Sequence, residues 1–380
     1  MAGRVLIHVG TPKSGTTYLQ SVWWANQAQL ADQGLLLPGD GVHEHFWASC
    51  VIRDNRRLLR SLPEQAPGAW QRVLEQSASW SGDVLISHEL FSPAADDRVG
   101  AALAELAEVA AEVHVVLTAR DLARQLPAEW QQRTKHGRFQ RLTEFVEEVR
   151  TEPTSPFWRV QDVPAVLERW SQGVAPERVH LVVLPPPGGP RTFLWDRLCE
   201  LTGVDGTGMA ERAVASNESL GLVEAETMRR VSERLNADGL SKTTERLMKG
   251  FFAEQMLRPT GDGTSTAEKI VAPPEVHSWL RERAEQFVTT LAGRGYDVVG
   301  QLGDLVPGAE PARGRGPDDV GDDEVALTAV TALARFVRHE ERARRHGRRP
   351  GAASPAADDA EESPDASRLT RLRERIARRD

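Results

Sequence analysis

Short apolar runs alternate with longer amphipathic segments in the first half of the chain. Each apolar run is bounded by turn or polar residues, which is typical of a buried strand. The predicted strands are Val5–Val9, Val84–Ser87, Val113–Thr118 and Val179–Leu184, with Leu35–Leu37 as a candidate fifth. The predicted helices between them are Thr16–Gln33, Phe46–Arg60, Ala69–Ser79, Asp97–Ala111, Leu122–Thr134 and Val163–Gln172. This alternation predicts an α/β fold with a doubly wound, mostly parallel sheet.

The second half of the chain has a different pattern. The spacing is helical up to about Leu291, and Tyr296–Val299 closes the part that we expect to be ordered. From Pro307 the composition shifts to Pro, Gly, Ala and Asp and then to arginine, which favours a flexible segment. We therefore expect one α/β domain over residues 1–305 and a flexible tail over 306–380. The parts of this tail with helix-forming composition are Val325–Arg345 and Ser367–Arg378. A helix there is a candidate for binding a protein partner.

Composition and charge narrow the class of protein. Of 380 residues, 47 are Lys or Arg and 55 are Asp or Glu, and the net charge of −8 argues against nucleic-acid binding by bulk electrostatics. No stretch approaches the roughly 18 uncharged apolar residues of a membrane span. The first strand follows Met1 too closely for a signal peptide, so we expect a cytoplasmic protein. The two cysteines, Cys50 and Cys199, form neither a disulfide framework nor a metal-ligand spacing.

The N-terminal strand leads into a glycine-bounded loop. Gly10-Thr11-Pro12-Lys13-Ser14-Gly15 separates the strand from the helix predicted to begin at Thr16. Backbone N–H groups and the positive end of a helix dipole converge in such a loop, which therefore predicts an anion-binding site. The two glycines have the spacing of a Walker A loop, but the lysine lies at position 13 instead of directly after Gly15. We therefore expect Lys13 to lie beside the bound anion.

The segment Pro12–Thr17, placed after this strand, resembles the 5′-phosphosulfate loop of sulfotransferases that use 3′-phosphoadenylyl sulfate (PAPS). The resemblance is to the bacterial members that act on carbohydrates or small molecules. It implies that PAPS is the co-substrate, that no metal is needed, and that a sulfuryl group passes to a hydroxyl or amine of the acceptor. It also implies that Lys13 assists the departure of the bridging oxygen. The residues that it assigns to the 5′-phosphate are Lys13, Ser14, Gly15, Thr16 and Thr17.

A second segment resembles the 3′-phosphate motif of the same family. The strand Val113–Thr118 ends just before Arg120, and a predicted helix begins at Leu122. This resemblance implies that Arg120 binds the 3′-phosphate, since a guanidinium group suits bidentate phosphate binding. The family usually has a serine eight residues later, where this chain has Ala128, so we expect Arg124 to act as a replacement donor.

A third segment offers one more cation for the nucleotide. Leu247-Met248-Lys249-Gly250 is predicted to bring Lys249 over the nucleotide, although a Lys-Gly pair between helices more often marks a helix end.

Transfer to a hydroxyl needs a base at the carboxyl edge of the sheet. The strand Val84–Ser87 leads into His88 and Glu89. Glu89 is the first candidate, because members of the family that act on carbohydrates use a glutamate and because apolar neighbours would raise its pKa. His88 is the second. His43 and His45, in a predicted loop, are expected to line the acceptor site.

Two other classes of function stay open. The first is a P-loop kinase that transfers phosphate from ATP with Mg²⁺, although such an enzyme usually has a lysine where this chain has Thr16. The second is a non-catalytic nucleotide-binding or scaffold protein of the same fold, which Ala128 and the long tail favour.

Overall fold

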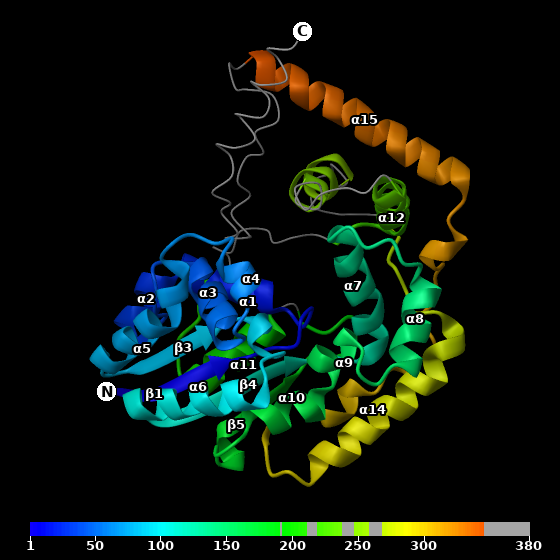
Figure 1. Cartoon of the computed structure of the whole chain (residues 1–380). Coiled ribbons are helices and arrows are strands. Elements are labelled where there is room, and N and C mark those ends of the chain that lie inside the picture. The colour runs from blue at the N-terminus through cyan, green and yellow to red at the C-terminus, as the bar shows by residue number, and fades with distance from the viewer. Residues whose placement is uncertain (191, 211–218, 238–246, 258–267, 346–380) are drawn as a thin grey trace.

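The centre of the molecule is a six-stranded sheet in which every neighbouring pair of strands is parallel. The computed structural model describes residues 1–190, 192–210, 219–237, 247–257 and 268–345. The strands, in the order β2-β3-β1-β4-β5-β6 across the sheet, are β1 (Ala2–His8), β2 (Leu35–Leu36), β3 (Asp83–Ser87), β4 (Ala110–Ala119), β5 (Val179–Val183) and β6 (Asp297–Val299). The predicted α/β fold with a mainly parallel sheet is confirmed (Figure 1).

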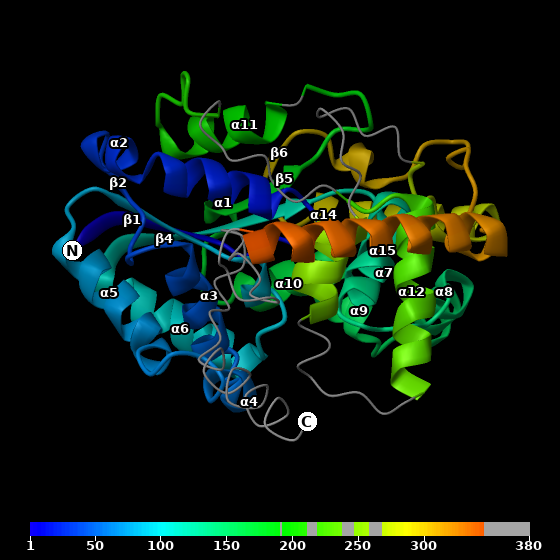
Figure 2. The ribbon, with the colours of Figure 1, turned by 90° about the horizontal axis from the view of Figure 1, so that it is seen from above.

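Helices cover both faces of this sheet (Figure 2). The helices of the first half are α1 (Thr16–Ala25), α2 (Gln27–Asp32), α3 (Val42–Ile52), α4 (Arg56–Leu59), α5 (Ala69–Ser79), α6 (Asp96–Val109), α7 (Leu122–Lys135), α8 (Leu142–Thr151), α9 (Pro156–Gln161) and α10 (Val163–Trp170). The later ones are α11 (Phe193–Thr202), α12 (Leu222–Ala237), the π-helix η5 (Met248–Leu257), α14 (His277–Ala292) and α15 (Asp322–Arg345).

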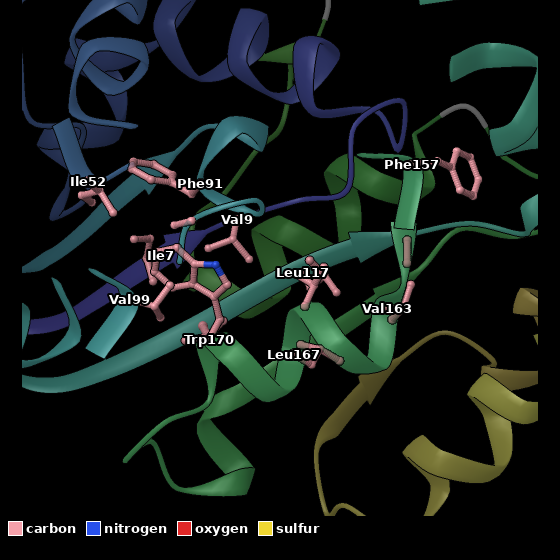
Figure 3. Packing of buried hydrophobic residues seen from close by; sticks show 14 of the residues in the cluster. Ile7, Val9, Ile52, Phe91, Val99, Leu117, Phe157, Val163, Leu167 and Trp170 are labelled. Atoms are coloured by element: carbon pink, nitrogen blue, oxygen red, sulfur yellow. The ribbon is translucent and has the colours of Figure 1, made fainter. Parts of the chain in front are cut away.

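The strands are apolar on both faces because each face packs against helices. In β1, Val5 and Ile7 belong to one buried cluster and Leu6 belongs to the other. Figure 3 shows Ile7 near Phe91 and Trp170 in the larger cluster, which also takes side chains from α3, α5, α6 and α10. The smaller cluster takes side chains from α1, α2 and α11.

The predicted helix Thr16–Gln33 is two helices, because Asn26 interrupts it. The Asn26 side chain donates hydrogen bonds to the carbonyls of Val22 (2.7 Å) and Met209 (3.1 Å). An asparagine side chain that bonds the backbone in this way competes with the helical pattern. The chain turns at Asn26, with φ −119° and ψ 18°, and α2 begins at the next residue.

The predicted helix Phe46–Arg60 has different bounds. It begins four residues earlier, at Val42, so His43 and His45 lie on α3 and not in a loop. It ends at Ile52, and Asp54 adopts a left-handed conformation (φ 49°) before the short helix α4 begins. The spacing of apolar residues does not reveal this break, because Leu58 and Leu59 of α4 also pack, partly buried, against the main core cluster.

The described part of the tail contains a long helix. The segment Val325–Arg345, noted for its helix-forming composition, lies within α15, which contacts α12 and η5. The segment Ser367–Arg378 lies outside the described residues.

Candidate functional site

The predicted site residues gather at the carboxyl ends of three adjacent strands, β3, β1 and β4. The chain leaves β1 toward β2 on one side of the sheet, and it leaves β4 toward β5 on the other side. Loops that part in this way leave a crevice between them, and ligands of doubly wound proteins bind there. The glycine-bounded loop follows β1, Glu89 follows β3 and Arg120 follows β4.

The loop after β1 turns through three left-handed residues. Gly10, Lys13 and Gly15 have φ values of 40°, 65° and 89°. A Cβ atom on Gly10 would lie 2.6 Å from Cγ2 of Thr16, and one on Gly15 would lie 2.5 Å from Cδ2 of Leu194. Both positions therefore require glycine. Gly15 also caps α1 without a side chain, so no side-chain cap covers the first N–H groups of the helix.

Ser14 supports the loop from beneath. Its hydroxyl donates to the carbonyl of Thr11 (2.5 Å) and hydrogen-bonds the Thr118 hydroxyl (2.7 Å), and Ser14 is fully buried. Its N–H also donates to the Thr11 carbonyl (3.3 Å). The structure therefore places the Ser14 hydroxyl in the framework of the loop.

His8 completes this framework and was not recognised from the sequence. Its ring nitrogens hydrogen-bond the hydroxyls of Ser87 (2.8 Å) on β3 and Thr118 (3.1 Å) on β4. Complete burial lowers the pKa of His8 to about 4, so the ring is neutral at pH 7. The signal in the sequence is a single polar residue at the end of an apolar strand. His8 thereby ties the three strands together under the loop.

Lys13 reaches across to α7. Its Nζ donates a hydrogen bond to Oε1 of Gln132 (2.6 Å), a residue 119 positions away. The side chain is exposed, and its charge acts on the carboxylates of Glu89 and Glu129. Lys13 therefore lies within electrostatic reach of two acidic side chains from different elements.

The next candidate, Glu89, has one carboxylate oxygen that accepts no hydrogen bond from the described residues. Its Oε2 is buried and has no hydrogen-bond partner among the described residues, while the side chain is 25% exposed. Burial raises the pKa of this carboxyl, but the neighbouring His88, a backbone N–H, Lys13 and the Thr16 hydroxyl outweigh it, and the pKa is lowered. The expectation that this pKa is raised is wrong, because the combined effect of these charges and hydrogen bonds exceeds that of burial.

His88 orients the start of the segment after β3. Its Nδ1 accepts a hydrogen bond from the N–H of Leu90 (3.1 Å), and lies 3.9 Å from Oε2 of Glu89. The ring packs against Phe46 of α3, with centroids 5.5 Å apart. The structure thus brings His88 and Glu89 together and occupies one ring nitrogen of the histidine.

Two arginines lie together at the start of α7. Arg120 donates from Nε to Gln125 Oε1 (2.8 Å) and from Nη2 to the Arg124 carbonyl (3.2 Å). Burial and the charge of Arg124 lower the pKa of Arg120 to about 10. Arg124 forms an ion pair with Asp121, while its Nη2 is buried without a hydrogen-bond partner among the described residues. An anion between the two guanidinium groups would relieve their repulsion and satisfy that nitrogen.

Gln125 links these arginines to the loop and was also missed. Its Nε2 donates to the Pro12 carbonyl (3.0 Å) and to Oε1 of Gln161 (2.9 Å), and its Oε1 accepts from Arg120. Gln161 donates to the same Pro12 carbonyl (3.1 Å) and to Glu129 (3.0 Å). Amides carry no periodic signal in a sequence, so only the fold reveals this connection.

The other predicted residues lie differently from expectation. His45 is buried, accepts from the Ser87 N–H (3.2 Å) and donates to the Pro38 carbonyl (2.9 Å), and burial lowers its pKa to about 3. Both of its ring nitrogens are thus used inside the protein, so it does not line an acceptor site. The His43 ring lies 4.4 Å from that of Trp47. Lys249 lies on η5, and its side chain is outside the described part of the structure.

No protein-family model matches the chain, and no curated protein is detectably similar to it in sequence. The described residues hold no group of three or more His, Cys, Asp or Glu side chains placed to bind a metal ion. In the same part of the chain, no helix has the length and apolar character needed to cross a bilayer. The molecule is therefore classed by its fold as an α/β protein.

Proposed function

We propose that this protein is a PAPS-dependent sulfotransferase. The observation that carries the proposal is the buried Oε2 of Glu89, which accepts no hydrogen bond from the described residues, lies within electrostatic reach of Lys13 and is on the carboxylate that Thr16 of the glycine-bounded loop hydrogen-bonds. An ionised carboxylate with a free oxygen suits the removal of a proton from an acceptor hydroxyl. A cation and a helix N-terminus next to it suit a sulfate ester joined to a phosphate.

The residues around the crevice fit such a nucleotide at two points. The uncapped start of α1, with the hydroxyls of Thr16 and Thr17, would hold the 5′-phosphate. Arg120 and Arg124 would hold the 3′-phosphate, and the buried, unpartnered Nη2 of Arg124 supports this assignment. Ala128, which is half-buried on α7, offers no side-chain donor where the family usually has a serine.

The residues of this chain divide the work of transfer. PAPS supplies a sulfuryl group whose S–O bond to the 5′-phosphate breaks as a new bond to the acceptor forms, S–O to a hydroxyl oxygen or S–N to an amine nitrogen. Glu89 takes the proton that the acceptor loses. Lys13 turns from Gln132 toward the crevice and stabilises the negative charge that develops on the departing phosphate oxygen. His88, next to Glu89, is one of the groups that lower the pKa of this carboxylate.

The acceptor class follows from what surrounds Glu89. The aromatic ring of Phe46 packs against His88, the residue next to Glu89, and α3 contacts the segment that carries Glu89. Such faces suit a sugar ring or another small molecule with an apolar side. We propose a carbohydrate or small-molecule acceptor with a free hydroxyl or amine.

A specific contact also favours a second candidate, a P-loop kinase. The Thr16 hydroxyl hydrogen-bonds the Glu89 carboxylate, and these are two oxygen ligands of the kind that Mg²⁺ prefers. A kinase would bind ATP at the same loop and use Mg²⁺ between this pair and the phosphates. The location of Lys13 within the loop favours the sulfotransferase.

One transfer assay separates the two candidates. The purified protein is incubated with PAPS labelled in its sulfuryl group and a panel of sugar and phenol acceptors, with excess EDTA. We expect labelled acceptor to form without metal, and Glu89→Gln to abolish it. Calorimetry should show binding of adenosine 3′,5′-bisphosphate in EDTA. Binding of ATP only with Mg²⁺, together with failure of every sulfuryl acceptor, would contradict the proposal and favour the kinase.

A further inference from the structure

Helix α15 carries an apolar face that points away from the protein. Leu327, Val330, Leu333 and Val337 are 70%, 64%, 62% and 58% exposed. At 3.6 residues per turn these four side chains lie within about 120° of the helix circumference. They therefore form one continuous stripe, the apolar stripe of α15, and not scattered surface residues.

The opposite face of α15 is anchored to the protein. Ala332 is buried in the main core cluster, and Arg335 donates a hydrogen bond to the Met256 carbonyl (2.9 Å). The ring of Phe336 packs against that of Phe251 at 6.0 Å. Figure 2 shows α15 at the surface, across α12. Because these inner contacts already fix the helix, folding of the described chain does not account for the apolar stripe.

The two ends of α15 differ in charge, and some of these charges are paired within the protein: Asp322 with Arg230, Glu324 with Arg315 and Arg345 with Glu341. At 3.6 residues per turn, Asp323 and Arg344 lie on the same side of the helix as the apolar stripe. The first turn carries three acidic residues and the last turn carries three arginines. The acidic ones are Asp322, Asp323 and Glu324, and the arginines are Arg342, Arg344 and Arg345. The apolar stripe lies between these ends, near the middle of the helix. A second helix with the same sequence matches this arrangement when it runs in the opposite direction.

We propose that the apolar stripe of α15 is a dimer interface, in which α15 of a second copy packs antiparallel across it. A twofold axis near the middle of the helix places each stripe on its partner. It also places the acidic first turn of one helix beside the arginine-rich last turn of the other. A parallel pair would set like charges together at both ends, and this difference selects the antiparallel arrangement.

The size of this interface sets how tightly the copies associate. A helix of 24 residues is about 36 Å long, and one pair of such helices buries less area than a standard protein interface. The dimer should therefore dissociate on dilution. Exposed apolar stripes of this kind are uncommon on monomeric proteins, and pairing removes the stripe from water.

Sedimentation velocity of the full-length protein over a range of concentrations tests the dimer. We expect a reversible shift from monomer to dimer in the unmodified protein. Leu327→Glu/Val337→Glu places four charges in the interface and should raise the dissociation constant at least about 100-fold. Both positions are exposed, so far-UV circular dichroism and the thermal midpoint should stay unchanged.

The matched control adds the same charge to an exposed helix elsewhere. Ala101 and Ala104 are exposed on α6, and Ala101→Glu/Ala104→Glu should leave dimerisation within about twofold. A full-length protein that stays monomeric at every concentration would overturn the proposal. So would a dimer that survives in Leu327→Glu/Val337→Glu, since its interface must lie elsewhere.

A charge exchange tests the antiparallel direction. Asp323→Arg and Arg344→Glu should each weaken the homodimer several-fold, because each change sets like charges together at both ends. An equimolar mixture of the two variants should recover the lost affinity through heterodimers. If either variant alone dimerises as the unmodified protein does, the antiparallel arrangement is wrong.

Discussion

Lys13 lies between two carboxylates whose surroundings have opposite effects on them. On the β3 side, His88, Lys13 and Thr16 outweigh the burial of Glu89 and lower its pKa. On the α7 side, burial outweighs the charges near Glu129, and the pKa of Glu129 is raised. Oε2 of Glu89 is buried and accepts no hydrogen bond from any residue that the structure describes, whereas Glu129 accepts one from Gln161.

Under the proposed function, this contrast favours a chemical role for Glu89 and a structural role for Glu129. A base has to be ionised, and the lowered pKa of Glu89 keeps its carboxylate ionised over a wider pH range than the raised pKa of Glu129 does. Glu129 instead joins the amide network of Gln125 and Gln161 that supports Pro12 of the loop. Four substitutions test this division between the β3 side and the α7 side.

The largest loss of transfer rate is expected when Glu89, on the β3 side, is substituted. Glu89→Gln keeps the shape of the side chain and removes proton acceptance, so it should lower the rate of sulfuryl transfer by about 10²- to 10⁴-fold. Single-turnover transfer of labelled sulfate measures the rate, and calorimetry should show unchanged binding of adenosine 3′,5′-bisphosphate. Glu129→Gln is the comparison and should cost less than about tenfold. Equal losses in the two variants would erase the distinction between the carboxylates.

The pH dependence of transfer follows from the same carboxylate. The pKa of Glu89 lies below its usual value of 4.5, and the group acts as a base only when it is deprotonated. Activity should therefore be retained as the pH falls from 7 to 5 and be lost only below 4.5, provided that the protein stays folded. An acidic limb near pH 6 would instead assign the base to a histidine such as His88.

The second effect concerns Lys13, which lies between the two sides. Lys13→Ala removes the cation that stabilises the departing oxygen and should cut the transfer rate by about 10²- to 10³-fold, with a smaller loss of nucleotide affinity. Gln132→Ala removes the α7 partner of Lys13 and should change the rate only a few-fold. An unchanged rate in Lys13→Ala would remove this lysine from the mechanism.

The third prediction concerns nucleotide binding by Arg120, on the α7 side. If Arg120 holds the 3′-phosphate, the protein should prefer adenosine 3′,5′-bisphosphate to adenosine 5′-monophosphate. A charge-assisted hydrogen bond contributes about 1.5 to 3 kcal/mol, so Arg120→Ala should lose about one to two decades of this preference. Arg150, exposed and paired with Glu147, is the control, and Arg150→Ala should change neither affinity. Equal affinity for the two nucleotides in the unmodified protein would show that no 3′-phosphate site exists.

The smallest effect comes from restoring a hydroxyl to α7. Ala128→Ser adds a donor on the helix that follows Arg120 and should tighten bisphosphate binding about two- to fivefold. Ala123→Ser makes the same change at another half-buried position of α7 and should leave the affinity unchanged. A weaker affinity in Ala128→Ser would mean that this face of α7 does not meet the phosphate.

Local patterns in the sequence were sufficient to predict the main strands of the sheet and the tight loop after β1. Apolar runs predicted all four main strands, since a strand buried on both faces needs apolar side chains throughout. The glycines at positions 10 and 15 predicted a tight loop, and both have positive φ. The helix break at Asn26 was missed, because it depends on a hydrogen bond to Met209, a residue 183 positions away.

The sequence by itself thus determined the α/β class, the loop after β1 and the residues that reach one edge of the sheet, because these depend on periodicity and on short-range backbone conformation. Only the tertiary structure decided what those residues do there. It directed Lys13 to Gln132, enclosed His8 and His45 as neutral rings, and lowered the pKa of Glu89. The physical reason is that burial and Coulomb interactions depend on groups that are distant in the chain and adjacent in space.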